Sequence, residues 1–173
     1  GYHSIAVPGM VAGLAKALER FGKLAWKDVL APGVALAQRG MQLDWYMQVM
    51  LANGAKHLTR FPASKAAYLC DNGMVPTNDW QGTTRYLKLG NLGDTMRRLA
   101  EGGPREFYEG SLARDIVADL QAGGSAISID DLAAYQARIV EPLSFEHHGV
   151  TINVAGGLTA GPTLRRTIEL AGE

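Results

Sequence analysis

The stretch REFYEGSLARDIVADLQAGG, residues 105–124, decides the fold class of this chain. Its apolar residues recur at the three- and four-residue spacing of an amphipathic helix, and two glycines end the pattern. The residues that share the apolar stripe are Tyr108, Leu112, Ile116, Val117 and Leu120. A helical stripe of this kind must be covered by other elements, so the segment predicts one helix of a packed helical domain.

Helical spacing recurs on both sides of this segment. Upstream, it extends over residues 10–21, 26–39, 43–58, 63–68 and 92–99. We expect Pro32 to divide the second of these into a short turn and a helix that starts at the proline, because proline lacks an amide hydrogen. Downstream, Ser128 precedes a helix and Asp131 stands three residues later, which is the capping-box arrangement. Residues 70–90 show no sustained period and predict a long loop with at most a small hairpin.

After Glu141 the apolar period changes from helical to two. Alternating residues on both sides of the turn EHHG, residues 146–149, predict a β-hairpin with one apolar face. These residues are Leu143 and Phe145 before the turn and Val150, Ile152 and Val154 after it. A helix over residues 162–170 follows. An isolated hairpin is marginal in water, so its apolar face must pack on helices or extend a larger sheet. We therefore expect a mainly α fold, with a helical domain over residues 1–140 and a β-hairpin plus helix over residues 141–173.

Composition excludes several classes of protein. The 173 residues include 17 Lys and Arg against 17 Asp and Glu, so the basic patch of a nucleic-acid-binding protein is not expected. No apolar run approaches the roughly 20 residues that span a membrane. Cys70 is the single cysteine, so neither an internal disulfide nor a cysteine metal cluster can form. The opening GYHSIAVPG lacks signal-peptide features and resembles the middle of a domain, which suggests a piece of a longer soluble, bacterial-type protein. Periplasmic and cytoplasmic locations both remain open.

The stretch NVAGGLTAGPTLRR, residues 153–166, places Gly156, Gly161 and Thr163 where a phosphate-binding loop has two glycines and a hydroxyl. Such a loop needs a lysine before the hydroxyl, and here that position is Pro162. Proline has no cationic group and no amide hydrogen, but it suits the first turn of a helix. We therefore interpret the stretch as an ordinary loop that leads into a helix.

The histidines do not form a recognisable metal site. His147 and His148 are neighbours in a predicted hairpin, so we expect their side chains to point to opposite sides, and no third ligand is near in sequence. His57 is expected on the polar side of its helix, and His3 lies in the opening segment.

Other reactive or aromatic residues also have structural explanations. Asp130 and Asp131 stand at a helix start, where the helix dipole and capping account for them. Cys70 has no cationic or histidine neighbour in sequence that would activate it. We expect the stripe of Trp45, Tyr46 and Met50 to be core. The sequence therefore predicts no catalytic, cofactor-binding or metal-ligating residue in this chain.

Two blocks resemble the gamma-glutamyltransferase (gamma-glutamyltranspeptidase) family. Residues 4–40 are similar to the family's Val-Pro-Gly-x-Val-Ala-Gly stretch and the helix that follows it. Residues 99–152 resemble its Gly-Pro-x-x-Phe-Tyr-x-Gly motif, double-glycine turn, Asp-Leu-Ala-x-Tyr helix and strand pair. The chain departs from the family at residues 155–163, where a proline-rich loop is usual, and at residues 86–100. These departures suggest a divergent branch and leave the substrate open.

The resemblance implies a fragment of an N-terminal-nucleophile (Ntn) hydrolase of αββα architecture. Members mature from a precursor that cleaves itself before a threonine, whose amine and hydroxyl then act on a gamma-glutamyl amide. That threonine lies in a Thr-Thr-His-like motif downstream of the matched region, and the arginine for the glutamyl carboxylate lies upstream. The GTTR at residues 82–85 lacks the histidine, so neither Thr83 nor Thr84 is expected to be the nucleophile.

The resemblance therefore predicts a large-subunit region that is inactive alone. Its parent would hydrolyse or transfer a gamma-glutamyl group of glutathione-like amides, or perform a related acylase reaction, without a cofactor. Its partners would be the rest of the large subunit and the small catalytic subunit, or a second copy through the open edge of residues 143–154. The alternative is a non-catalytic helical interaction module from an inactive paralogue.

Overall fold

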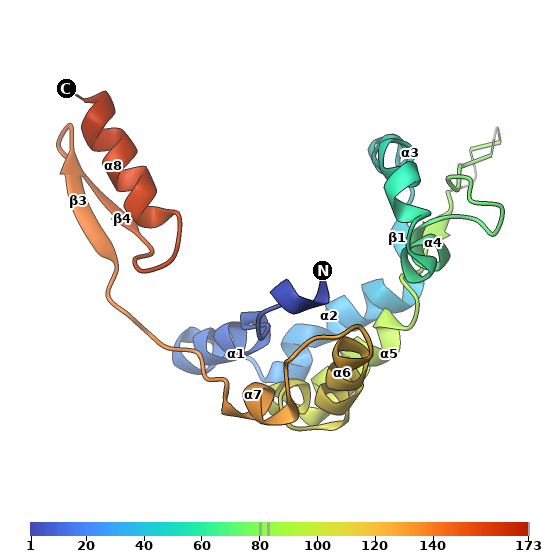
Figure 1. The fold of residues 1–173 in the computed structure, drawn as a ribbon, viewed down its shortest axis with the longest axis horizontal. Coiled ribbons are helices and arrows are strands. Elements are labelled where there is room, and N and C mark those ends of the chain that lie inside the picture. Colours follow the sequence, from blue (N-terminus) through green and yellow to red (C-terminus); the bar gives the residue numbers. More distant parts are fainter. Residues whose placement is uncertain (80, 83, 173) are drawn as a thin grey trace. The chain divides into compact units, whose positions relative to one another are not determined.

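The computed structural model describes residues 1–79, 81–82 and 84–172. The chain divides into two compact units, Gly1–Ala137 and Arg138–Glu173. It is mostly helical and contains two small antiparallel sheets (Figure 1). Within the described residues, no helix is both long enough and apolar enough to cross a membrane. The mainly α class predicted from the sequence is therefore confirmed.

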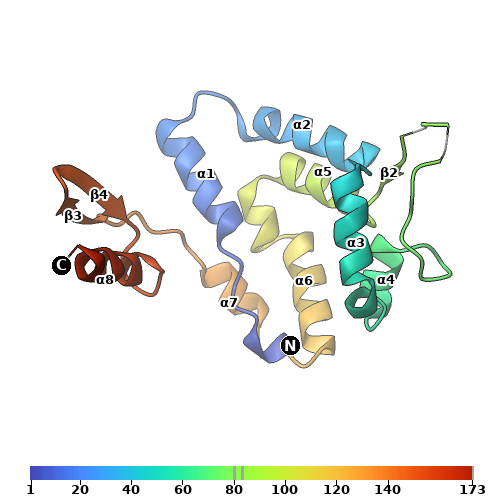
Figure 2. The same cartoon turned by 90° about the horizontal axis from the view of Figure 1, so that it is seen from above.

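The first unit is built from short helices joined by loops. Figure 2 shows α5 and α6 in the middle of this unit, with α1 on its left and α2 along its top. The elements in chain order are η1 (Tyr2–Ser4), α1 (Met10–Phe21), α2 (Trp26–Arg39), β1 (Met41–Gln42), α3 (Trp45–Leu58), α4 (Pro62–Tyr68), β2 (Tyr86–Leu87), α5 (Leu92–Gly102), η2 (Pro104–Phe107), α6 (Ser111–Ala122) and α7 (Ile129–Ala134).

The stripe predicted in residues 105–124 lies in the core of this unit. Its buried members are Tyr108, Leu112, Val117 and Leu120, while Ile116 is partly buried. Ala113 and Val117 of α6 pack against Leu132 of α7, and Val7 from the N-terminal segment joins them. The predicted capping box of α7 is also present, because the Ser128 hydroxyl accepts a hydrogen bond from the Asp131 amide and the Asp131 carboxylate accepts one from the Ser128 amide.

The expected break at Pro32 is wrong. The α2 helix runs without interruption from Trp26 to Arg39. A proline in a helix interior removes one hydrogen bond, here the one that the Asp28 carbonyl would accept. Tertiary packing offsets this cost, since α2 lies along α5 and the Trp26 indole nitrogen donates to the Leu99 carbonyl at 2.9 Å.

In the described part of residues 70–90, no hairpin forms within the loop itself. Instead β2 pairs antiparallel with β1, so that Met41 lies opposite Leu87. Asn78 strengthens this closure, because its side-chain amide donates to the Leu43 carbonyl at 2.7 Å and accepts from the Arg85 amide at 3.1 Å. A pairing between residues more than forty positions apart gives no local sequence signal. Trp80 and Thr83 lie outside the described residues.

The α3 helix does not bury the aromatic stripe that the sequence suggested. Trp45, Tyr46 and Met50 are 75%, 55% and 42% exposed, so the prediction of a core position is wrong for all three. Leu51 is the buried residue of this helix, at 6% exposure. The helical period placed Leu51 with Tyr46 and Met50 on one apolar face of α3, but it could not show that only the Leu51 side of that face becomes buried.

The second unit consists of a hairpin and one helix. Strands β3 (Leu143–His147) and β4 (Val150–Val154) pair antiparallel as predicted, and α8 (Gly161–Ala171) packs against β3. Phe145 lies opposite Ile152 on the apolar face, and the Arg165 guanidinium of α8 lies 5.8 Å from the Phe145 ring centroid. Polar cross-strand pairs occupy the other face, including a hydrogen bond between Ser144 and Asn153. The hairpin therefore obtains part of its cover from α8.

Candidate functional site

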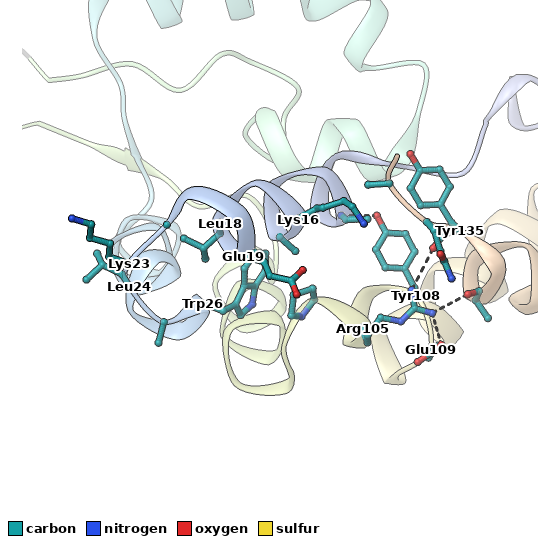
Figure 3. Close-up of a pocket in the computed structure, with 18 residues that line it drawn as sticks. Lys16, Leu18, Glu19, Lys23, Leu24, Trp26, Arg105, Tyr108, Glu109 and Tyr135 are labelled. Carbon is teal, nitrogen blue, oxygen red and sulfur yellow. Dashed lines mark hydrogen bonds and ion pairs between the residues drawn. The ribbon is translucent and has the colours of Figure 1, made fainter. Parts of the chain in front are cut away.

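An open groove of about 940 Å³ is present in the first unit (Figure 3). It lies between α1, the loop after α1, η2 and the end of α7. Its aromatic walls are Trp26, Tyr108 and Tyr135, and its charged residues are Lys16, Glu19, Lys23, Arg105 and Glu109. A groove with aromatic walls and several charges is the natural candidate for a functional site.

Tyr108 forms the inner wall of this groove and is only 1% exposed. Its hydroxyl donates to the Pro8 carbonyl at 2.8 Å and accepts from the Ala12 amide at 3.0 Å. Ala12 lies in the first turn of α1, where amides have no partner within the helix. The N-cap residue Gly9 has no side chain to bind them, so the phenol of Tyr108 caps α1 from a distant part of the chain. Burial raises the pKa of Tyr108, which keeps the hydroxyl protonated for this role.

Tyr135 completes the junction from the end of α7. Its ring stacks on the Tyr108 ring with centroids 5.6 Å apart and planes 12° apart. The backbone of Gly9 lies directly against Tyr135, because a Cβ on Gly9 would stand 2.1 Å from the phenolic oxygen. Gly9 has an ordinary helical backbone, with φ −97° and ψ −8°. The position therefore requires glycine for space rather than for backbone freedom.

Arg105 ties the end of α7 to η2. Its terminal nitrogens donate to the carbonyls of Ala133 at 2.8 Å and Tyr135 at 3.3 Å, and to the Glu109 carboxylate (Figure 3). The hydrogen bond from Arg105 lowers the pKa of Glu109, and the same bond raises the pKa of Arg105. Both terminal nitrogens are thus engaged by protein acceptors, and Arg105 acts here as a structural tie.

Glu106 performs a second capping role next to the groove. Its carboxylate accepts hydrogen bonds from the Ser111 hydroxyl at 2.5 Å and the Leu112 amide at 3.1 Å, at the start of α6. These bonds lower the pKa of Glu106, the Ser111 hydroxyl being the main cause. A lowered pKa in the folded state means that the cap stabilises above the ordinary pKa of glutamate and is lost as the pH falls through the lowered one. A Cβ on Gly110 would stand 1.8 Å from this carboxylate, so the glycine keeps the cap in place.

The remaining polar groups of the groove do not form a catalytic arrangement. The Trp26 indole is satisfied by a backbone carbonyl, and Lys16, Glu19 and Lys23 are exposed to water. The groove residues include no serine, threonine, cysteine or histidine that could act as a nucleophile or base. The chemistry of the groove is therefore that of a packing surface with a structural junction at its inner wall.

The loop before α8 satisfies its own polar groups. The Gly161 amide donates to the Thr159 hydroxyl at 3.1 Å, and that hydroxyl donates to the Ala155 carbonyl at 2.7 Å. The α8 helix begins at Gly161, with Pro162 in its first turn as expected. Residues 155–161 thus act as the tight connection between β4 and α8.

The two adjacent histidines differ from the prediction. The rings of His147 and His148 lie 4.1 Å apart, so the expectation that they point to opposite sides is wrong. His148 has a φ of 47° and belongs to the turn, and the alternation of an extended chain does not apply to it. Among the described residues, no three His, Cys, Asp or Glu side chains are grouped as metal ligands. His3 and His57 are exposed in η1 and α3.

The other residues singled out from the sequence lie apart from the groove. Asp130 and Asp131 are exposed in the first turn of α7. Cys70 is half-buried, and its backbone amide donates a hydrogen bond to the Met74 carbonyl, which closes a turn. Thr84 is exposed, while Thr83 lies outside the described residues. The structure does not bring any of these residues that it describes into the groove.

Comparison with known proteins identifies the family. A family model described as Gamma-glutamyltranspeptidase matches residues 1–171 of the 173. The chain belongs to the gamma-glutamyltranspeptidase family. The resemblance stated from the sequence motifs is therefore confirmed.

Individual relatives agree with this assignment. The glutathione hydrolase proenzyme of Pseudomonas aeruginosa is 33% identical over 161 residues, which is 90% of this chain and 26% of that protein. The Acylase ACY 1 proenzyme of Pseudomonas sp. is 32% identical over 152 residues, 88% of this chain and 26% of that protein. The gamma-glutamyltranspeptidase of Helicobacter pylori has the same fold, with a TM-score of 0.82 at 23% identity over 94% of this chain and 45% of that chain. The chain spans about a quarter of the length of these curated relatives.

The motifs that carry the family resemblance meet at the groove. The Val-Pro-Gly motif supplies Pro8 and Gly9, the Gly-Pro-x-x-Phe-Tyr motif supplies Tyr108, and the Asp-Leu-Ala-x-Tyr motif supplies Tyr135. Sequence reasoning identified each motif but missed that they form one junction. The signal available was the presence of a glycine and two tyrosines in three separate motifs, without any indication that they touch.

We predict opposite effects from alanine at two glycines of the α1 region. Gly9→Ala should lower the free energy of unfolding by about 1–3 kcal/mol, because its Cβ would overlap Tyr135. Gly13→Ala is the matched control, since no atom lies within 4 Å of its Cβ. Gly13 lies inside α1, and alanine there should stabilise by about 0.5–1 kcal/mol. Urea unfolding of both variants measures the difference, and equal effects would contradict the packing of Gly9 on Tyr135.

A second prediction separates the two tyrosines. Tyr108→Phe should lower the free energy of unfolding by about 1–3 kcal/mol, because the Ala12 amide and the Pro8 carbonyl lose their partner. Tyr135→Phe keeps the stacked ring, and its hydroxyl makes no hydrogen bond in the described part of the chain, so its effect should be smaller. Denaturant titration of both variants provides the test. A Tyr108→Phe variant as stable as the wild type would rule out capping of α1 by the phenol.

Proposed function

We propose that residues 1–173 are part of the large subunit of a gamma-glutamyltranspeptidase-like Ntn hydrolase and supply its scaffold. The observation that carries this proposal is the junction of Gly9, Tyr108 and Tyr135. The family motifs meet there, and their polar groups bind one another. Groups that are satisfied in this way hold backbone segments together and are not free for a substrate.

The parent protein would break the amide bond of a gamma-glutamyl compound such as glutathione, or of a related acyl amide. The names of the glutathione hydrolase and acylase relatives support both substrate classes. The nucleophile would be a threonine released when a precursor cleaves itself, and it would lie outside residues 1–173. The name proenzyme, which both relatives carry, supports maturation from a precursor.

The second unit would contribute its hairpin to the central sheet of that enzyme. Each strand of a two-stranded sheet has one edge whose amides and carbonyls lack a strand partner. Only one face of β3 and β4 carries apolar residues, and α8 packs on that side. This layering of one helix on one sheet face matches the outer half of an αββα arrangement. Its partners would then be the rest of the large subunit and the small catalytic subunit, with a homodimer through residues 143–154 as the alternative.

We predict that the 173-residue chain releases no product from a gamma-glutamyl anilide, because the described groove residues include no serine, threonine, cysteine or histidine. The longer polypeptide encoded by the same gene should release product after maturation. Thr83→Ala and Thr84→Ala variants of the 173-residue chain are the controls. Turnover by this chain that either change abolishes would overturn the proposal, and an inactive but matured longer protein would favour the inactive-paralogue alternative.

Hydrogen exchange tests the proposed role of the hairpin. Amides on the open edges of β3 and β4 should exchange rapidly in the monomeric 173-residue chain and be protected in the longer protein. Amides within α6, which contributes four buried residues to the core of the first unit, serve as the control and should be protected in both. Protection of residues 143–154 that rises with the concentration of the 173-residue chain would instead show a homodimer. Protection in a demonstrated monomer would show that the unit needs no added strand.

A further inference from the structure

The α1 helix presents its large apolar residues to water. Met10, Leu14 and Phe21 are 76%, 59% and 76% exposed. Together with exposed Ala17 they follow a four-three-four spacing, which places all four on one stripe of the helix. Figure 2 shows α1 at the periphery of the Gly1–Ala137 unit. We call these four residues the α1 stripe.

The unit holds α1 through a different face. Ala12 and Ala15 line the groove, and the Ala12 amide binds Tyr108. Leu18 lines the groove beside these alanines, whereas Met10, Leu14 and Phe21 lie on the exposed stripe. The helix therefore carries a second apolar surface that the unit does not cover. Single exposed apolar side chains are normal, but a continuous stripe along a helix indicates an interaction surface.

We propose that the α1 stripe binds the part of the longer gamma-glutamyltranspeptidase polypeptide that lies outside residues 1–173. This inference rests on the proposed function, since it requires that longer protein. The chain accounts for about a quarter of the length of its relatives. In the H. pylori structure the same fold occupies 45% of the chain, so more than half of that chain is available to cover surfaces that this unit leaves open.

The surroundings of the stripe indicate the chemistry of the surface that covers it. Arg20 lies beside the stripe, with its guanidinium 5.3 Å from the Phe21 ring centroid, and Lys23 follows in the next loop. Exposed Leu24 lies in the loop that follows the helix and lines the groove. The covering segment should therefore present apolar side chains at its centre and acidic or neutral polar residues at the side that meets Arg20.

Cysteine labelling tests the proposal without any need for activity. Leu14→Cys and Phe21→Cys are made singly in a Cys70→Ser background, in both the 173-residue chain and the longer gene product. Lys16→Cys is the matched control, because Lys16 is exposed on another face of the same helix. Maleimide labelling, read at the α1 peptide by mass spectrometry, should slow by at least about tenfold at residues 14 and 21 in the longer protein, and change little at residue 16.

A charged variant provides a second arm. Leu14→Asp should leave the helical circular dichroism of the 173-residue chain unchanged, because Leu14 is mostly exposed there, yet lower the yield of folded longer protein several-fold. Lys16→Asp controls for the added negative charge and should change neither. If Leu14→Asp and Lys16→Asp gave equal yields of folded longer protein, the proposal would be contradicted.

The labelling outcomes also separate this proposal from other occupants of the stripe. Equal labelling rates in the short and long proteins would overturn it. Protection of residues 14 and 21 in the 173-residue chain that increases with concentration would assign the stripe to a second copy. Protection in a dilute monomer would assign it to another part of the same 173 residues. A longer protein that protects the stripe but lacks gamma-glutamyl turnover would support this inference while contradicting the proposed activity.

Discussion

The packing of the first unit depends on the two hydrogen bonds of the Tyr108 hydroxyl. This hydroxyl caps the start of α1 by accepting from the Ala12 amide, and it donates to the Pro8 carbonyl just before that helix. A helix usually receives this cap from its own N-cap side chain, and here Gly9 has none. Gly9 cannot have one, because Tyr135 occupies the space of its Cβ. A contact made across the fold therefore replaces a local one and fixes where α1 begins.

This constraint explains why motifs far apart in the sequence belong together. The N-terminal segment, η2 and the end of α7 each supply one part of the junction, and Arg105 fastens α7 to η2 beside it. The Tyr108 hydroxyl and both terminal nitrogens of Arg105, which line the groove, are hydrogen-bonded in these contacts. The motifs that place this chain in the gamma-glutamyltranspeptidase family thus contact one another within the described residues.

Several surfaces of the two units are left uncovered within the described residues. The α1 stripe and the aromatic face of α3 expose large apolar side chains, and the hairpin of the second unit has open strand edges. All three features suit a segment of a longer protein, and the relatives of this chain are about four times its length. They share one physical cause, which is that apolar surface and unpaired strand edges are stable in water only when something covers them.

The sequence by itself determined the helical class, the presence of the hairpin with its apolar face, and the capping box of α7, because each depends on residues that are close together in the chain. The period of residues 105–124 also identified buried residues, since the stripe of α6 does face the core. Only the tertiary structure decided that α2 continues through Pro32, because the cost of one missing hydrogen bond is weighed against packing on α5. The tertiary structure alone also decided that β2 pairs with β1 rather than with a strand next to it in the sequence. It likewise decided that the aromatic residues of α3 face water. Helical period places apolar residues on a face, but the face that becomes buried depends on which other elements arrive there, and that is a property of the whole fold.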